Sequence, residues 1–438
     1  MSASDLQTLL LLAIALLAGT LAVIMALKKP WWAAVVAVAS LPLVPYWVGV
    51  SVAIFYVPAS LGLAFLATIA ILRRGTARPR LGAVDAALLA LLALVLLAFL
   101  LRLVTIAQAY AFVQWFTIYA FARVAASAYG VRRLATVFVT TAAVAAGFIL
   151  LEAATGINVW ARFVRFGGLY STWGTLQYRG GVLRAEGAFG HSIAAGGSLA
   201  VAAVLALDAR LKLGQRLGLV ALLLAATLAT FSRLGMATAA AGVAVALLAG
   251  RFDLSRRARA ALLGVLAVSA IFFVLFLSSV FAESGSEAAN SAAYRTWLLE
   301  LVPTTQPLGT ADSYARTTDG RVTYGAFRSI DSALLLFALA YGWLPTIVVI
   351  ALATLSVAWA LSFRAGTAAI AVAAQAASLT SVALITQYGL IFWLAVGWAV
   401  TEVLQRRPIP SPAPEGLVVG SAGPPVPQAR VREEPVGC

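Results

Sequence analysis

The sequence predicts an all-α fold: a polytopic helical membrane protein with about 12–13 transmembrane helices and two larger outer loops. Composition is the first reason, because 62% of the 438 residues are hydrophobic and only 11% are charged, whereas soluble proteins average about 25% charged residues. The second reason is that the apolar residues gather in runs of roughly 20, the length that crosses a bilayer. Such runs must be helical, because the bilayer core offers no water to satisfy backbone groups.

Thirteen apolar runs are candidates for these helices, and each is long enough or nearly long enough to span a bilayer. They are residues 6–27, 31–50, 52–72, 84–104, 106–122, 134–153, 189–207, 217–232, 234–250, 260–281, 331–350, 366–385 and 387–404. No basic segment precedes the first run and no small-residue cleavage pattern follows it, so we expect a retained helix rather than a signal peptide.

The basic residues predict the orientation, because Lys and Arg collect in cytoplasmic loops. Of the 31 basic residues, 21 fall in the connections after alternate helices, beginning with Lys28 and Lys29, which assigns that side to the cytoplasm. The other ten fall on the outer side and are all arginine. Arginine grips phosphate with two parallel hydrogen bonds, so this contrast favours an outer face that binds an anion. A genome that prefers arginine codons would give the same contrast.

Charge and cysteine content limit the partners. The net charge of +15 fits cytoplasmic loops against anionic lipid, and we expect a lipid bilayer and no nucleic acid as partner. The one cysteine, Cys438, excludes an internal disulfide and a cysteine-ligated metal site.

The chain divides into one transmembrane domain, residues 1–404, and a Pro-rich tail, residues 405–438, whose composition predicts a disordered cytoplasmic segment. The outer loops are residues 155–188 and 282–330. The first is crowded with aromatic residues, including Trp173 and Tyr178, beside four arginines. Aromatic rings near a membrane surface are usually anchors at the membrane–water interface. The functional interpretation is a groove in which the rings bind the apolar faces of sugars.

Four stretches, in order along the chain, resemble the O-antigen ligase and O-antigen polymerase family of bacterial surface-polysaccharide enzymes. The first resembles the family's Gly-x-Phe-x-His stretch, the second its Ser-Arg-Gly pattern, the third an Arg followed by Pro-x-Gly, and the fourth a polar pair that opens a helix. They are RAEGAFGHSIAAG at 184–196, TFSRLG at 230–235, YRTWLLELVPTTQPLG at 294–309 and RSIDSALLLFALAYGWLP at 328–345. The resemblance covers residues 150–360.

The resemblance implies a GT-C type membrane glycosyltransferase in the bacterial cytoplasmic membrane, with its active site facing outward. The implied donor is a saccharide linked to polyprenyl pyrophosphate (undecaprenyl pyrophosphate in type), and the acceptor is a saccharide or lipid. The resemblance also implies that the reaction needs no metal and no other cofactor, because arginines neutralise the pyrophosphate.

The leaving pyrophosphate requires positive charge that is in place before its own charge develops. The candidates for this role are Arg233 and Arg295, followed by Arg184. Arg233 lies between two apolar runs, at an outer turn where its charge need not enter the hydrocarbon. Arg233 alternatively reaches lipid headgroups as a surface residue, and Arg295 alternatively pairs with a nearby acid such as Glu300.

The acceptor hydroxyl requires a base, and here the sequence departs from the ligases, which carry a histidine in the last motif. This chain has Asp331, so we expect Asp331 to take the proton or to position the acceptor, and the departure favours a polymerase. Asp331 alternatively caps a helix. His191, the only histidine, together with Ser232 and Arg328 from the motifs, completes the predicted substrate-binding set. His191 alternatively has a purely structural role.

Two other functions fit parts of the sequence. A transporter or flippase for an anionic lipid or solute would place polar groups at the bilayer midplane, whereas the charges here cluster at helix ends. A SEDS-type peptidoglycan polymerase shares the helix number and a functional outer aspartate, but lacks the Ser-Arg and Gly-x-Phe-x-His pieces. The transferase hypothesis requires Arg233, Arg295 and Asp331 to face one outward cavity.

Overall fold

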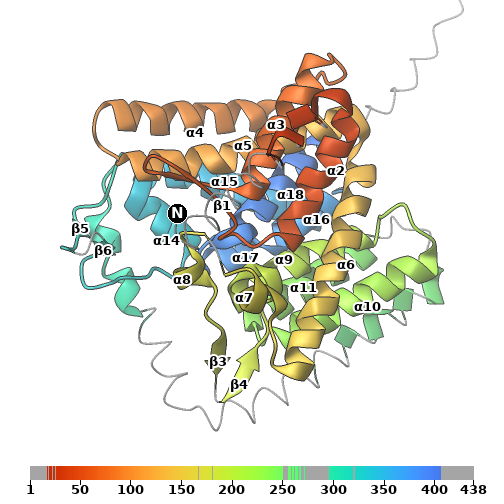
Figure 1. Ribbon diagram of the computed structural model, residues 1–438. Helices are drawn as coiled ribbons and strands as arrows, with labels where there is room; N and C mark the ends of the chain where they lie inside the picture. The colour runs from red at the N-terminus through yellow and green to blue at the C-terminus, as the bar shows by residue number, and fades with distance from the viewer. Residues whose placement is uncertain are drawn as a thin grey trace, which may run out of the picture. The chain divides into compact units, whose positions relative to one another are not determined.

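The computed structural model describes most of the chain between residues 17 and 405, and it is mostly helical (Figure 1). The described residues are 17, 19–21, 23, 24, 26–165, 167–179, 181–249, 255–257, 259, 260, 262–264, 266, 267, 271, 294, 296–318 and 321–405. Most of the expected helix over 260–281 and most of the expected first helix, 6–27, lie outside these residues, as does the tail beyond residue 405.

The first half of the fold runs from α2 to the 3₁₀ helix η1. Its elements are α2 (Pro30–Leu43), β1 (Gly49–Val52), β2 (Phe55–Pro58), α3 (Ala59–Arg73), α4 (Ala83–Leu100), α5 (Ile106–Tyr129), α6 (Val131–Thr155), α7 (Val159–Phe163), α8 (Tyr170–Trp173), β3 (Gln177–Arg179), β4 (Val182–Arg184) and η1 (Gly187–Phe189).

The second half runs from α9 to α18. Its elements are α9 (Ser192–Ala206), α10 (Leu213–Ala229), α11 (Arg233–Leu248), η2 (Val302–Thr304), β5 (Tyr314–Arg316), β6 (Val322–Tyr324), α14 (Ala333–Tyr341), α15 (Trp343–Leu361), α16 (Thr367–Ala374), α17 (Ala376–Leu379) and α18 (Thr386–Gln405). The strands form three antiparallel two-stranded hairpins, β1–β2, β3–β4 and β5–β6.

Among the described residues, α4, α6, α15 and α18 are long and apolar enough to cross a membrane, judged by length and composition. The other apolar helices in this part of the chain have 10–17 residues; they include α2, α3, α9, α10 and α11. The chain is therefore a helical protein with the character of a membrane protein.

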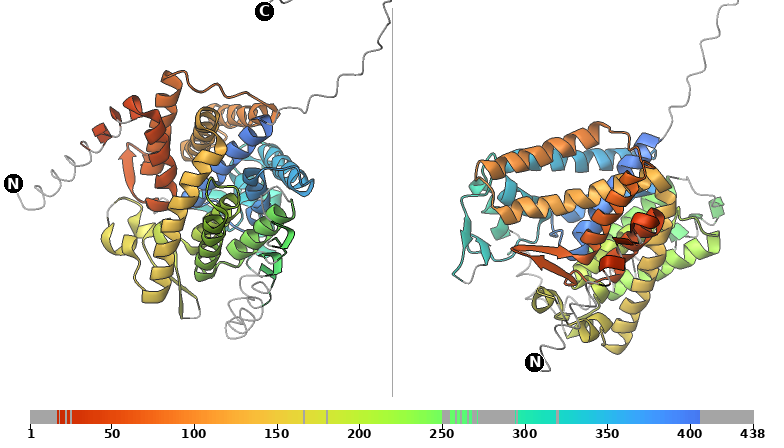
Figure 2. Two further views of the ribbon diagram at one scale, coloured as in Figure 1. Left: turned by 90° about the vertical axis from the view of Figure 1, so that its right-hand side faces the viewer. Right: turned by 45° about the horizontal axis from the view of Figure 1, so that its top comes forward.

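Several expected helices have different bounds in the structure. The run 366–385 forms α16 and the short α17, and the helical part ends at Leu379. The run 31–50 forms a helix only to Leu43, because Pro45 disfavours the helical conformation at Val44, which is extended. The run 52–72 begins as the hairpin strand β2 and becomes helical at Ala59. Figure 2 shows this β1–β2 hairpin, in red, beside the helices that it joins.

The expected helix over 331–350 is divided at Gly342. This residue has φ +97°, and a Cβ there would lie 2.7 Å from the Leu308 Cα and from the Pro307 carbonyl oxygen. The nine-residue α14 ends at this point, and the longer α15 begins at Trp343. A glycine in the left-handed region with backbone packed against it thus separates one predicted span into a short helix and a long one.

Small residues let the central helices approach closely. α9 packs against α10, α11 and α18, and every residue of α9 except Ile193 is buried. α18 packs along α5 and also contacts α9 and α16 (Figure 1). A Cβ on Gly397 of α18 would lie 2.5 Å from the Ala122 Cβ of α5, so this helix pair depends on the glycine.

Hydrogen bonds gather the hairpins and several helix starts at one end of the bundle, which we call the hairpin end. The Trp47 indole donates to the Val164 carbonyl, and the Gln387 amide donates to the Val44 and Ala188 carbonyls. The Tyr341 hydroxyl donates to the Gln108 carbonyl at the start of α5. The described part of the second expected outer loop also reaches this end, since the Thr310 N–H donates to the Leu103 carbonyl, just after α4.

Candidate functional site

The segment 184–191 lies beside the turn that precedes α11. The backbone N–H of Ala185 donates to the carbonyl of Ala229, the last residue of α10, at 3.3 Å. Gly187 and Gly190 both have positive φ, and a Cβ on Gly190 would lie 2.7 Å from the Trp173 carbonyl oxygen. The first two motifs of the sequence are thus adjacent in space, and the glycines in the first are required by the chain path.

Glu152, near the end of α6, holds this segment in place. Its carboxylate accepts hydrogen bonds from the backbone N–H of Gly187 at 2.8 Å and of Glu186 at 3.2 Å. The Asn158 amide donates to the same carboxylate at 2.9 Å and to the Gly187 carbonyl at 2.9 Å. Glu152 is 1% exposed, so these three donors replace its hydration.

Glu186 is a second buried acid in the same place. Its side chain is fully buried, and neither carboxyl oxygen has a hydrogen-bond partner among the described residues. Burial raises the pKa of Glu186 to about 9; the Glu152 charge raises it further, and the Arg184 charge opposes both. Glu186, the only acid in the segment 184–191, therefore carries a proton at neutral pH.

His191 precedes α9 and serves as its N-cap. Its Nδ1 accepts a hydrogen bond from the Ile193 N–H at 3.1 Å, and its ring centroid lies 6.4 Å from that of Trp173. Burial lowers the pKa of His191 to about 4, and the nearby charge of Arg184 contributes in the same direction. His191 is therefore neutral at physiological pH and acts as an acceptor for the helix start.

Arg233 is the first residue of α11, and its side chain is exposed. The turn before it is tight: Phe231 has φ +48°, and Thr230 Oγ1 accepts from the Ser232 N–H at 3.2 Å. Ser232 is the N-cap, since its Oγ accepts from the Gly235 N–H at 3.2 Å. A hydrogen bond between Ser232 Oγ and a substrate would therefore compete with this capping hydrogen bond.

The starts of α9 and α11 lie side by side. A Cβ on Gly235 would come within 2.7 Å of the Gly196 Cα, so the two helices touch one turn inside their first residues. A helix N-terminus carries a partial positive charge, and such ends bind phosphate groups. Arg184, which is 6% exposed, and Arg233 add two guanidinium groups to this pair of helix ends.

Asp331 and Arg328 are exposed and precede α14. Asp331 Oδ1 accepts a hydrogen bond from Ser329 Oγ at 3.3 Å. Asp331 is not the helix cap: Ser332 has that role, because its Oγ accepts from the Leu335 N–H at 3.2 Å. The short helix α17 contacts both α11 and α14, so the helices that begin near Arg233 and Asp331 share a neighbour.

The remaining predicted residues are more scattered. Trp173 ends α8 and lies beside Gly190 and His191. Tyr178, on β3, is 62% exposed. Arg295 lies outside the described residues, so the structure brings together Arg184, His191, Ser232, Arg233 and Trp173 but leaves Arg295 unplaced.

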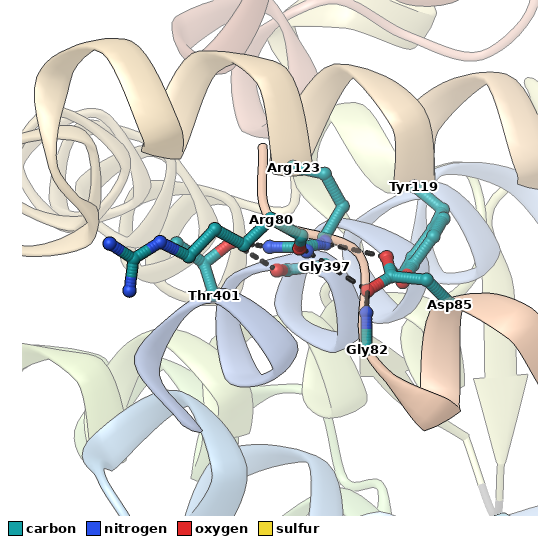
Figure 3. Close-up of polar contacts among 7 residues, drawn as sticks. All are labelled: Arg80, Gly82, Asp85, Tyr119, Arg123, Gly397 and Thr401. Carbon is teal, nitrogen blue, oxygen red and sulfur yellow. Dashed lines mark hydrogen bonds and ion pairs between the residues drawn. The ribbon is translucent and has the colours of Figure 1, made fainter. Parts of the chain in front are cut away.

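A buried ion pair lies away from this site (Figure 3). The Arg123 Nε donates to Asp85 Oδ1 at 2.8 Å, and the two side chains are 5% and 4% exposed. The Tyr119 hydroxyl donates to the same carboxylate oxygen at 2.6 Å. Arg123 Nη1 donates to Thr401 Oγ1 at 2.6 Å, so the pair joins α4, α5 and α18.

Sequence reasoning missed Glu152, Glu186, Gln387 and this ion pair. Glu152 had a usable signal, because it is the only charged residue in the run 134–153 and an acid within an apolar span marks a functional or paired group. Asp85 has a similar signal, because it is the only acid in the run 84–104. Glu186 and Gln387 had none: the Glu186 carboxyl has no hydrogen-bond partner among the described residues, and the partners of Gln387 are backbone carbonyls far away in the sequence.

No cluster of three or more His, Cys, Asp or Glu side chains suited to a metal ion occurs in the part of the chain that the structure describes. Comparison with protein-family models, with curated proteins and with solved structures found no match to this chain.

Proposed function

We propose that this chain is a membrane glycosyltransferase of the O-antigen polymerase and ligase type. It would transfer or polymerise saccharide units linked to a lipid pyrophosphate, on the outer face of a bacterial cytoplasmic membrane. The observation that carries the proposal is the contact between the starts of α9 and α11, flanked by Arg184 and Arg233. The four sequence motifs that resemble the family support the same assignment.

The proposed chemistry is a displacement at the anomeric carbon of the donor sugar. The acceptor hydroxyl oxygen forms a bond to that carbon, and the bond from the carbon to the pyrophosphate oxygen breaks. The pyrophosphate leaves with the bonding electron pair, and Asp331 takes the acceptor's proton. Charge that is already in position stabilises the leaving group without reorganisation, which is the role of Arg184, Arg233 and the two helix ends.

The charge on the segment 184–191 favours an anion. Glu152 already binds three donors, and the proton on Glu186 removes a second negative charge that would repel phosphate. His191 is neutral, so it supplies no cation and instead fixes the start of α9. Arg184 and Arg233 are therefore the residues that we assign to the pyrophosphate, and Trp173 and Tyr178 those that we assign to the sugars.

The distribution of basic residues supports the orientation that this chemistry needs. Lys and Arg concentrate opposite the hairpin end, for example Arg73 and Arg74 at the end of α3 and Arg210 after α9. Under the positive-inside rule, the hairpin end faces outward and α18 ends at the cytoplasm. A lipid-linked pyrophosphate at headgroup depth would then meet Arg233 without entering the hydrocarbon.

Purified protein in detergent tests this proposal with a polyprenyl-pyrophosphate-linked oligosaccharide and no added metal. We expect elongated or transferred glycan together with released polyprenyl pyrophosphate. In Arg233→Ala the rate should fall about 100-fold, as for other residues that stabilise developing charge, whereas the matched variant Arg364→Ala, at the opposite end, should retain the wild-type rate. Equal rates in both variants, or no turnover by the folded wild-type protein, would overturn the proposal.

A further inference from the structure

A separate cavity of about 640 Å³ lies between α4, α5, α14, α15, α16 and α18. Gly82 and Leu404 line one end, close to the start of α4 and the end of α18. Thr105 and Gln108 line the other, at the start of α5. The cavity therefore extends along α4, whose 18 residues span about 27 Å, close to the roughly 30 Å of a bilayer's hydrocarbon core.

The chemistry of the lining changes along this length. Most of the wall is formed by Ala, Leu, Val and aromatic side chains, and α14 covers the cavity with Leu334, Phe337 and Tyr341 among others. Arg316 of β5 is the one charged residue in the lining. It lies in the β5–β6 hairpin with Tyr314 and Tyr324, whose ring centroids are 5.8 Å apart. The cavity thus combines a long apolar body with a single cationic group at the hairpin end.

Several residues of the lining carry buried polar atoms without a hydrogen-bond partner among the described residues: the Trp393 indole, the Trp359 indole and the Gln108 amide nitrogen. Trp393 of α18 lines the cavity and is 7% exposed, and its indole Nε1 has no hydrogen-bond partner among the described residues. A buried donor without an acceptor costs about 1–3 kcal/mol. The ester carbonyl of an acyl chain supplies such an acceptor, whereas an isoprenoid chain consists of hydrocarbon alone.

The cavity is distinct from the proposed pyrophosphate site. None of the residues 184–191 or 230–235 lines it, and neither does Asp331. The segment that ends α17 and leads to α18 separates the two: Leu384 and Ile385 line the cavity, while Gln387 donates to the Ala188 carbonyl on the other side. A headgroup bound at Arg316 is therefore not held by Arg184 and Arg233.

We propose that this cavity holds the acyl chains of an anionic phospholipid from the surrounding membrane, with the lipid phosphate bound by Arg316. The occupant is a resident lipid and not the reacting donor. It fills the space between α14 and the helices α4, α15 and α18. The lipid would thereby hold α14, which covers the cavity, against these long helices. Arginine suits this role because its planar fork binds phosphate through paired hydrogen bonds.

Native mass spectrometry of the full-length protein tests the proposal, first as purified in mild detergent and then after titration with phosphatidylglycerol. Two variants address the two parts of the site: Arg316→Gln removes the cation, and Ala353→Phe fills the cavity from α15. Each has a matched control that does not line the cavity: Arg364→Gln for the charge, and Ala351→Phe on the exposed side of α15.

We expect one bound phospholipid on the wild type and on both controls. Arg316→Gln should weaken phosphatidylglycerol binding about tenfold, the loss of roughly 1.4 kcal/mol of a charge-assisted contact, and Ala353→Phe should abolish it. Equal binding by Ala353→Phe and Ala351→Phe would overturn the site. Binding of a polyprenyl phosphate in place of phosphatidylglycerol, lost in Ala353→Phe, would overturn the assignment of the occupant. No uptake of phosphatidylglycerol by the folded wild type would overturn the proposal entirely.

Discussion

Gly196 of α9 and Gly235 of α11 lie in direct contact, so close that a Cβ atom on Gly235 would be 2.7 Å from the Gly196 Cα. This contact sets the distance between the two helix starts that we assign to the substrate pyrophosphate. The positive ends of both helices can act on one anion only while the helices remain this close.

Substituting Gly235 with alanine should separate the two helices, because backbone atoms of Gly196 have no room to give way. We expect a loss of about 1–3 kcal/mol of stability, the usual cost of overpacking, and a fall in transferase rate. Thermal unfolding and the glycan transfer assay measure the two effects. Gly218→Ala on α10 is the control, since nothing lies within 4 Å of a Cβ there; equal effects of the two variants would contradict the role of the contact.

The ion pair between Asp85 and Arg123 should contribute to stability and not to the chemistry. Asp85→Ala leaves the Arg123 guanidinium buried without its carboxylate, and breaking a buried pair in this way costs about 3–5 kcal/mol. We expect a lower unfolding temperature, measured by thermal denaturation in detergent. Replacing Arg123 with methionine in the same chain should recover part of the loss. A double variant as unstable as Asp85→Ala would show that the uncompensated charge is not the cause.

Glu152→Gln should disturb the segment 184–191 without changing side-chain volume. The amide nitrogen of glutamine cannot accept a hydrogen bond, so at least one of the three donors to Glu152 loses its partner. The expected cost is about 1–3 kcal/mol, with a lower affinity for the donor substrate because Arg184 shifts. Glu300→Gln, at an exposed position, is the control. Wild-type stability and substrate affinity in Glu152→Gln would rule out the carboxylate as the support of this segment.

The proton on Glu186 predicts how stability depends on pH. Its pKa is about 9 in the folded chain, against 4.5 for the ordinary carboxyl. Between these values the folded chain keeps a proton that the unfolded chain releases, so this group's contribution is complete below about pH 4.5 and is lost as the pH rises towards 9. Thermal unfolding of wild type and Glu186→Gln across this range measures the effect. The variant should have the flatter profile, and parallel profiles would contradict the assignment.

The helical class could be predicted from the sequence because composition and apolar run length depend on the chain alone. The lengths of individual helices did not. The run 31–50 is apolar throughout, yet Pro45 ends α2 early, and the run 331–350 is divided because Gly342 packs against residues 307 and 308. Hydrophobicity does not distinguish a helix from an apolar hairpin or from two helices joined at a glycine.

The candidate site was predictable where its residues belong to local motifs, as with Arg233 after Ser232 and His191 before α9. Its supporting contacts were not, because they join distant segments. Glu152 binds the N–H groups of residues 186 and 187, and Gln387 binds the carbonyl of Ala188 from α18. Backbone N–H and carbonyl groups occur at nearly every residue, so no sequence pattern identifies which ones a buried side chain will meet.

The central claim is that Arg184, Arg233 and two helix ends bind a lipid-linked pyrophosphate during glycan transfer. The most direct measurement is mass spectrometry of polyprenyl-linked glycans from a strain that lacks the protein, complemented with wild type, Arg233→Ala or Arg364→Ala at equal expression. We expect carrier-linked saccharide to accumulate in the deletion and in Arg233→Ala only: single repeat units for a polymerase, finished chains for a ligase. Identical carrier-linked glycans in all the strains would contradict it.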